Sequence, residues 1–199
     1  MFLARLCAVL LIASSVMAAT DVGERDFTRL RTIGLPGEAS IYIFTSAGCP
    51  HCATFHRNIL PEVIKKYSDT GRAQIFLVDD ASTSPALEVS MLARCLPEDK
   101  SEIFMTKVFE NQSEWIKQKD MMDRLIRYAV TAGMTKRQVQ QCLSDANLRI
   151  AIQDQWANLS HLYHIEYLPT IAVRRGNSVR TYTGANKAVL NGMEFDFQQ

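Results

Sequence analysis

The chain has 199 residues, of which 47% are hydrophobic and 22% are charged, and its formal net charge is +1. This length supports one domain, or one domain with an insertion, around a sizeable buried core. The near-neutral charge leaves no basic stripe that could neutralise phosphates, so it argues against nucleic acid as the main partner.

The chain begins with an apolar run. A weakly positive start at Arg5 precedes apolar residues 6–16, and small residues around Ala18 suit cleavage by a signal peptidase. We predict a cleaved signal peptide over residues 1–18, because the run is shorter than the ~20 residues that a membrane-spanning helix needs. An uncleaved membrane anchor is the alternative. The polar stretch 20–35 then predicts a short helix or an edge strand.

A strand, a turn, a helix and a second strand follow. Residues 41–45 are β-branched and aromatic throughout, which predicts a short buried strand, and residues 46–48 supply the turn. Apolar residues at helical spacing predict a helix over residues 53–67, which Thr70-Gly71 ends. Residues 73–78 predict another buried strand, and a strand–helix–strand unit of this size has parallel strands.

From residue 85 to about residue 162 the apolar residues recur with the period of an α-helix. This pattern predicts successive helices over residues 87–96, 101–111, 115–132, 135–143 and 145–161. Strands return at 170–174 and 178–182, and Gly176-Asn177 between them predicts a tight antiparallel hairpin. A short final helix is expected over 185–190. The order indicates one sheet domain with a helical insertion.

The tetrapeptide Cys49-Pro50-His51-Cys52 lies between the first buried strand and the predicted helix. Unpaired backbone N–H groups and the helix dipole favour a thiolate at a helix start, so we expect a lowered pKa for Cys49. Pro50 suits the first helical turn, where a missing N–H costs nothing. Two cysteines at this spacing can close a small, easily exchanged disulfide ring. The motif therefore predicts a redox site.

The other cysteines fit an exported protein. Cys7 lies in the predicted signal peptide, which leaves an even number of cysteines, as is usual in an oxidising compartment. Cys95 and Cys142 fall on apolar faces of two predicted helices, and we interpret them as a structural disulfide that clamps these helices. Closing a loop of about 48 residues could add roughly 4 kcal/mol of stability. Two reduced core thiols are the alternative.

Three features together resemble the thioredoxin superfamily. They are the cysteine pair Cys49 and Cys52 at a helix start, the segment Leu168-Pro169-Thr170 just before a strand, and the final hairpin. The Pro-His dipeptide and the helical insertion are similar to DsbA-like proteins, the periplasmic dithiol oxidases. Further matching pairs are Phe55-His56, Leu60-Pro61, Lys66-Tyr67 and Thr70-Gly71.

The resemblance implies an α/β structure, a thioredoxin fold with an inserted all-helical domain. We place the two parts of the thioredoxin-like domain at residues 19–82 and 165–199, and the helical insertion at residues 83–164. The family also implies that Pro169 is a cis proline stacked against the disulfide. Leu168 and Thr170 beside it would then bind an extended substrate strand. An ordinary trans proline entering a strand is the alternative.

In the predicted chemistry Cys49 is the nucleophile and Cys52 is the resolving partner. A substrate thiolate attacks the disulfide at Cys49, and a second substrate thiol resolves the mixed disulfide. His51 would add a nearby donor or positive charge, unless it is only an exposed spacer. The reaction needs no metal and no cofactor beyond the redox-active disulfide.

The resemblance further implies a periplasmic oxidase whose substrates are unfolded secreted polypeptides with free thiols. A membrane quinone-linked partner resembling DsbB would reoxidise it. We expect a monomer that does not bind nucleic acid. Two other functions stay open, a disulfide reductase and a chaperone or secretion accessory that keeps the fold without turnover. The reductase is disfavoured because its usual dipeptide is Gly-Pro.

One position departs from the family pattern. Thioredoxin and many relatives carry a buried carboxylate six residues before the first cysteine, and Ile43 occupies that position in this chain. A proton route to Cys52 would then need water, Asp79 or Asp80.

A metal site is the remaining alternative for the cysteine pair. Zinc could be bound by Cys49, Cys52 and His56, since the last two lie four residues apart on one helix face. A single Cys-x-x-Cys with no evident fourth ligand disfavours it.

Overall fold

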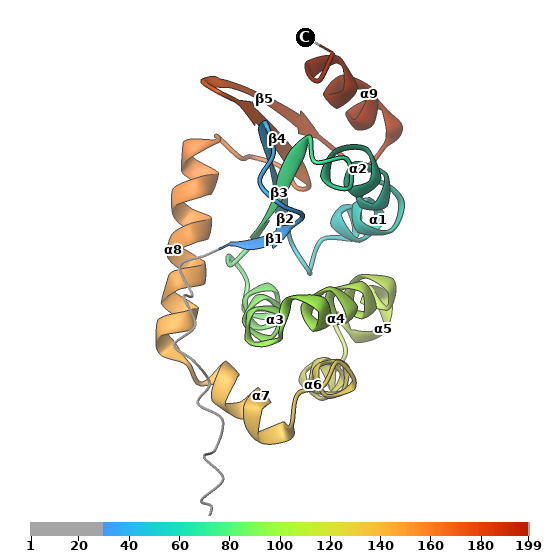
Figure 1. Ribbon diagram of the computed structural model, residues 1–199. Coiled ribbons are helices and arrows are strands. Elements are labelled where there is room, and N and C mark those ends of the chain that lie inside the picture. Colours follow the sequence, from blue (N-terminus) through green and yellow to red (C-terminus); the bar gives the residue numbers. More distant parts are fainter. Residues whose placement is uncertain (1–29, 199) are drawn as a thin grey trace, which may run out of the picture.

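The computed structural model describes residues 30–198, so the predicted signal peptide over residues 1–18 lies outside the described residues. A mixed sheet forms the upper part of the molecule, with α8 on one side and α1, α2 and α9 on the other (Figure 1). Helices α3 to α7 form a second layer below the sheet. Of the helices between β3 and β4, α3 to α7 therefore build the lower part, and α8 runs back beside the sheet.

The five-stranded sheet has the order β1-β3-β2-β4-β5. β2 and β3 are parallel, as the strand–helix–strand pattern predicts, and the other neighbours are antiparallel. The edge position of β1 agrees with one of the two alternatives for residues 20–35. The strands are β1 (Arg31–Ile33), β2 (Ala39–Thr45), β3 (Ala73–Asp79), β4 (Thr170–Arg175) and β5 (Ser178–Thr183).

The helices include each segment whose apolar spacing predicted one, with several boundaries moved. They are α1 (Pro50–Asn58), α2 (Leu60–Val63), the π-helical turn η1 (Ile64–Ser68), α3 (Ser84–Cys95), α4 (Glu98–Glu110), α5 (Gln112–Trp115), α6 (Met121–Thr131), α7 (Lys136–Leu143), α8 (Ala146–Leu162) and α9 (Lys187–Asp196). Among the described residues, no helix has the length and apolar character that a membrane crossing requires.

The helix predicted over residues 53–67 is interrupted. α1 ends at Asn58, and Ile59 has a φ of −113°, outside regular helical geometry. Pro61 explains the break, because a proline has no N–H to donate and its ring clashes with the carbonyl four residues earlier. The apolar spacing survives the break, so both pieces still bury one face.

The single helix predicted over residues 115–132 is wrong. α5 ends at Trp115, whose indole N–H donates to the Val108 carbonyl at 2.8 Å and whose side chain is fully buried. Lys117 then adopts a left-handed conformation with a φ of 64°, and α6 starts only at Met121. The buried anchor of the indole fixes α5 in place and forces the chain to turn before α6.

The final helix is also longer than predicted. α9 continues to Asp196, whereas the polar residues near the C-terminus predicted an end near Leu190. Asp196 is buried because β5 provides its partners: Arg180 forms an ion pair with it at 3.0 Å, and the Tyr182 hydroxyl donates to its carboxylate. Gly192 lets the helix approach closely, since a Cβ there would lie 2.5 Å from the Tyr182 ring.

Separate apolar clusters stabilise the two layers. One cluster fills the space between the sheet and α1, α2 and α9, and it includes Ile43 and Phe55. Another lies on the opposite face, where Phe44 packs against Tyr163 and Trp156 of the α8 region. The largest cluster joins α3, α4, α6, α7 and α8 within the helical layer. Cys52 belongs to this last cluster, so the site motif contacts the helical layer directly.

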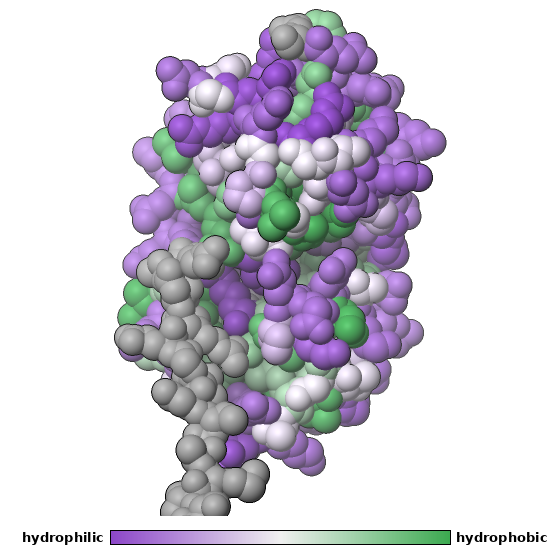
Figure 2. Space-filling view, viewed as in Figure 1, coloured by the Kyte–Doolittle hydropathy of each residue, from purple (hydrophilic) through white to green (hydrophobic). Residues whose placement is uncertain are grey.

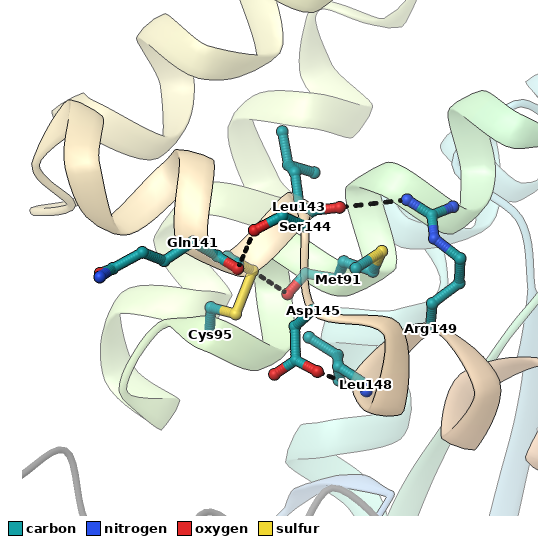
Figure 3. Close-up of a disulfide and its surroundings, with 9 residues drawn as sticks. Met91, Cys95, Gln141, Leu143, Ser144, Asp145, Leu148 and Arg149 are labelled. Carbon is teal, nitrogen blue, oxygen red and sulfur yellow. Dashed lines mark hydrogen bonds between the residues drawn. A yellow bond between two sulfur atoms is a disulfide. The ribbon is translucent and has the colours of Figure 1, made fainter.

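A disulfide ties α3 to α7 in the helical layer (Figure 3). Cys95 and Cys142 have Cα atoms 6.1 Å apart, and the Cys142 sulfur lies 3.1 Å from the Met91 carbonyl oxygen. The turn that follows α7 is capped locally, because the Asp145 carboxylate accepts from the backbone N–H of Leu148 at 3.0 Å. The bond therefore joins the last residue of one helix to the last turn of another.

Replacing both Cys95 and Cys142 by alanine should lower the free energy of unfolding by about 2–4 kcal/mol. Without the bond, the two positions, 47 residues apart in sequence, are no longer held together in the unfolded chain, whose conformational entropy rises. Urea unfolding of the two proteins at the same pH measures the difference. The double replacement should leave the rate of thiol–disulfide exchange at Cys49 unchanged. An unfolding free energy equal to that of the parent would contradict a stabilising bond.

Candidate active site

The site is built where β2 ends and α1 begins. The turn after Thr45 is closed by the backbone N–H of Cys49, which donates to the Ser46 carbonyl at 3.1 Å. Cys49 is the N-cap residue of α1, and its sulfur accepts from the backbone N–H of Cys52 at 3.4 Å. An N-cap acceptor satisfies an N–H that has no partner within the helix. The sulfur of Cys49 thus takes the place of a capping oxygen.

Cys52 occupies the first turn of α1 and is fully buried. The backbone N–H of Ser46 donates to its sulfur at 3.4 Å. Both cysteines are free thiols, and Cys49 is half-buried whereas Cys52 is buried. Attack from outside can therefore reach Cys49 and not Cys52.

The two thiols differ strongly in acidity. The hydrogen bond from Cys52 is the largest cause that lowers the pKa of Cys49, to about 6, and the N–H groups of Cys52 and His51 add to it against the effect of burial. The same hydrogen bond and burial raise the pKa of Cys52. At neutral pH Cys49 is mostly thiolate and Cys52 is a thiol.

The segment before β4 lies across from Cys49. The Cys49 sulfur is 3.7 Å from the Leu168 carbonyl oxygen, and the Leu168–Pro169 peptide bond is cis. Pro169 is buried and Leu168 is half-buried. Thr170 is 4% exposed, and its hydroxyl is bonded to the Tyr167 carbonyl and to Thr183. Leu168 is therefore a partly exposed residue of this segment that lies beside the Cys49 sulfur.

The residues between the cysteines face outward. Pro50 is exposed at the first helical position, and His51 is exposed beside it. The positive charge of His51 and its backbone N–H both lower the pKa of Cys49, as smaller contributions than that of Cys52. His51 thus acts on Cys49 through charge and backbone, with its ring in solvent.

Gln112 of the helical layer holds the site loop, and no pattern in the sequence predicted this role. Its side-chain amide donates to the carbonyl oxygens of Ala47 at 2.7 Å and Cys49 at 3.0 Å, and the residue is 6% exposed. Only the fold reveals this contact, because α5 is a four-residue helix in a segment without periodic signal. Gln112 fixes the loop that carries Cys49.

The sequence also missed the polar contacts beneath Cys52. The Thr45 hydroxyl is a smaller cause that lowers the pKa of Cys52, and it lies 3.0 Å from Nε2 of His56. His56 thus has the Thr45 hydroxyl as its side-chain hydrogen-bond partner. Within residues 30–198, no three His, Cys, Asp or Glu side chains are grouped to hold a metal ion.

The two aspartates expected near Cys52 have other partners. The Asp79 carboxylate accepts from Nη2 and Nε of Arg31 at 2.6 and 3.1 Å. Burial raises the pKa of Asp79, but the charge and hydrogen bonds of Arg31, together with the charge of Arg94, outweigh burial and hold that pKa below its usual range. The Asp80 carboxylate accepts from the backbone N–H of Ser82 at 2.8 Å. Both carboxylates have their own bonding partners.

Known proteins agree with this architecture. A family model described as thioredoxin matches residues 33–185. The chain belongs to this thioredoxin family. The alpha-DsbA1 protein of Wolbachia pipientis has a similar structure, with a TM-score of 0.75 at 20% identity over 83% of this chain and 89% of that one. BdbD of Bacillus subtilis reaches 0.72 at 16% identity, covering 85% and 94%. These likenesses establish a thioredoxin fold with the helical insertion of DsbA-type proteins.

Curated proteins whose names state an activity match a shorter part of this chain than the solved structures do. A Rickettsia bellii protein named "Putative protein-disulfide oxidoreductase" is 31% identical over 103 residues, which are 51% of this chain and 40% of the relative. A Rickettsia prowazekii protein of the same description is 30% identical over 102 residues, 51% of this chain and 38% of the relative. The chain thus spans about two fifths of the length of these relatives.

Ultraviolet absorbance of the thiolate in the reduced protein should titrate with a midpoint near pH 6, because the pKa of Cys49 is lowered to about 6. Replacing Cys52 by alanine should move the midpoint upward, since the hydrogen bond from Cys52 is the largest cause of the shift. A midpoint in the range of an ordinary thiol in the unaltered protein would contradict this geometry.

The same ionisation makes the stability of the reduced protein depend on pH. The pKa of Cys49 is about 6 in the folded state, against 9.0 for an ordinary cysteine. The thiolate therefore adds stability that is complete above the ordinary pKa and is lost as the pH falls through the folded one. Chemical unfolding of reduced and oxidised samples should show this loss in the reduced protein alone, and parallel curves would refute it.

Replacing Gln112 by alanine should lower the free energy of unfolding by about 1–3 kcal/mol, because two carbonyl oxygens lose their shared donor. Gln140 on the exposed face of α7 is the matched control, and its replacement by alanine should change the free energy by less than about 0.5 kcal/mol. Equal effects of the two replacements in urea unfolding would show that Gln112 does not hold the loop.

Proposed function

We propose that this protein is a protein thiol:disulfide oxidoreductase that exchanges a Cys49–Cys52 disulfide with thiols of other polypeptides. One observation carries the proposal: an acidic, half-exposed Cys49 caps α1 beside a fully buried Cys52 of raised pKa. Exchange needs one sulfur that a partner can reach and one that only its neighbour can reach. The names of the curated Rickettsia relatives support the same class of activity.

The proposed direction is oxidation of substrates. A substrate thiolate attacks Cys49 of the oxidised protein, a new sulfur–sulfur bond forms, and Cys52 leaves as a thiolate that takes up a proton. A second substrate thiolate attacks the substrate sulfur of this mixed disulfide, and Cys49 leaves as a thiolate. The low pKa of Cys49 stabilises the reduced protein and makes Cys49 a good leaving group, which is the property of an oxidant.

Leu168 is proposed to guide the substrate. Its carbonyl oxygen lies 3.7 Å from the Cys49 sulfur, at the start of an antiparallel strand. An extended substrate segment beside it would hydrogen-bond backbone to backbone, which binds many sequences equally. Pro169, which shares the cis peptide bond with this carbonyl, and Thr170 are both buried beside Leu168.

The setting of this reaction is proposed from the resemblance to DsbA-like proteins and from the predicted signal peptide. The protein would be exported to the periplasm and act there as a monomer on unfolded secreted polypeptides. A membrane quinone-linked partner resembling DsbB would reoxidise Cys49 and Cys52. A reductase, or an accessory that binds without turnover, remains the competing function that the next experiment distinguishes.

The reduction potential of the Cys49–Cys52 pair should lie near the ~−120 mV of DsbA, well above the ~−270 mV of thioredoxin. Equilibration with glutathione buffers and thiol trapping measures it, with a parallel sample in which Cys95 and Cys142 are alanine. A value near that of thioredoxin would make the protein a reductase. A Cys49→Ser variant should lose all exchange, and a Cys52→Ala variant should accumulate mixed disulfides; exchange by C49S would sink the assignment.

A further inference from the structure

Cys52 must gain a proton in one half of the proposed cycle and lose it in the other, yet it is fully buried. Its thiol forms when a substrate displaces it from the disulfide, and it must ionise again when the pair is reoxidised. A buried thiol of raised pKa cannot exchange protons with solvent directly. Ile43 stands where many thioredoxin relatives carry a carboxylate, and an alkyl side chain cannot take a proton.

Polar side chains lie between this sulfur and the surface of the protein. The backbone N–H of Ser46 donates to the Cys52 sulfur at 3.4 Å, and the hydroxyl of the preceding residue, Thr45, is 1% exposed and acts on the same sulfur by lowering its pKa. The same hydroxyl lies 3.0 Å from Nε2 of His56, which is one turn further along α1. A hydroxyl can accept a proton from one neighbour while it donates its own to another, and a neutral imidazole can do the same through its two nitrogens.

The last of these side chains reaches a large cavity. His56 forms part of the wall of a cavity of about 1320 Å³ that lies between β1, α2, α3 and α4. Figure 2 shows the face on which β1 lies, with apolar atoms exposed between the upper and lower parts of the molecule, and neither Cys49 nor Leu168 lines the cavity. Solvent protons can therefore reach His56 while a substrate covers Cys49.

The imidazole is held in one position and one charge state. Its ring stacks on Phe109 with centroids 3.8 Å apart and planes 16° from parallel. Burial is the main cause that lowers the pKa of His56 to about 3; the charge of Arg31 acts in the same direction, and that of Asp79 opposes it. Arg94 of α3 faces the same Asp79. A neutral ring at physiological pH has one nitrogen that accepts and one that donates.

We propose that Thr45 and His56 form a proton relay between the buried Cys52 sulfur and the solvent of this cavity. The inference rests on the proposed disulfide exchange. When Cys52 leaves as a thiolate, the Thr45 hydroxyl gives it a proton, Nε2 of His56 replaces that proton, and Nδ1 takes one from water. When Cys52 attacks the Cys49 mixed disulfide, the proton travels the opposite way. The two halves of the cycle restore the original tautomer of His56.

The test follows the reduced protein as it reacts with oxidised glutathione. In the first step the Cys49 thiolate attacks glutathione disulfide and releases one glutathione thiolate. In the second step Cys52 loses its proton and attacks Cys49, which releases the other. Acid quenching and mass spectrometry count the mixed disulfide over time, so the two rate constants are obtained from the same samples.

Thr45→Val and His56→Gln should each slow the second step by at least about tenfold and leave the first step within about twofold. The double variant should be no slower than Thr45→Val alone, because both residues serve one path. Thr45→Val also removes a group that lowers the pKa of Cys52, so His56→Gln, which touches neither sulfur, is the decisive variant. Its reduction potential should be unchanged, since a relay alters rates and not the equilibrium.

His161→Gln on the exposed side of α8 is the matched control and should leave both steps unchanged. A second step of unaltered rate in His56→Gln would overturn the relay. Equal slowing of both steps, or a shifted reduction potential, would also overturn it and assign His56 a structural role. If the unaltered protein formed no mixed disulfide at all, the proposed function itself would fail, and this result is distinct from the others.

Discussion

The pairing of β2 with β4 is the interaction on which the site depends. Phe44 and Thr170 are register partners at the end of this antiparallel pair, although 126 residues separate them in the chain. The pairing places the loop after β2 beside the segment before β4, so the Cys49 sulfur and the Leu168 carbonyl come within 3.7 Å. β3 pairs with the other edge of β2 and prevents it from shifting. A central strand fixed on both sides is what positions the thiol.

The helical layer is part of the site and does more than cover it. Gln112 of α5 holds two carbonyl oxygens of the Cys49 loop, and Phe109 of α4 stacks on His56. Arg57 of α1 donates in turn to the Phe109 carbonyl at 2.8 Å. The disulfide in α3 and α7 braces the helices behind these contacts. The helical layer therefore positions both the site loop and His56.

The sequence predicted the features that local physics decides. The strands, the hairpin at Gly176-Asn177 and the start of α1 at the cysteine motif follow from side-chain periodicity and turn chemistry. It could not predict the break after Trp115 or the length of α9, because distant partners, a buried indole and Asp196 with Arg180, set those ends. The contact between Thr45 and His56 was missed for the same reason, as spacing alone cannot show which atoms meet across a strand and a helix.

Ile43 connects the acidity of Cys49 with the route of the proton. A buried carboxylate at this position would place a negative charge beneath the cysteine pair and disfavour the Cys49 thiolate, since like charges raise the pKa of an acid. Ile43 is fully buried and uncharged, so the hydrogen bonds at the start of α1 act on Cys49 without this opposition. The same substitution removes a proton acceptor for Cys52. A neutral path through Thr45 and His56 restores the proton transfer without restoring the charge, which keeps Cys49 acidic and Cys52 able to react.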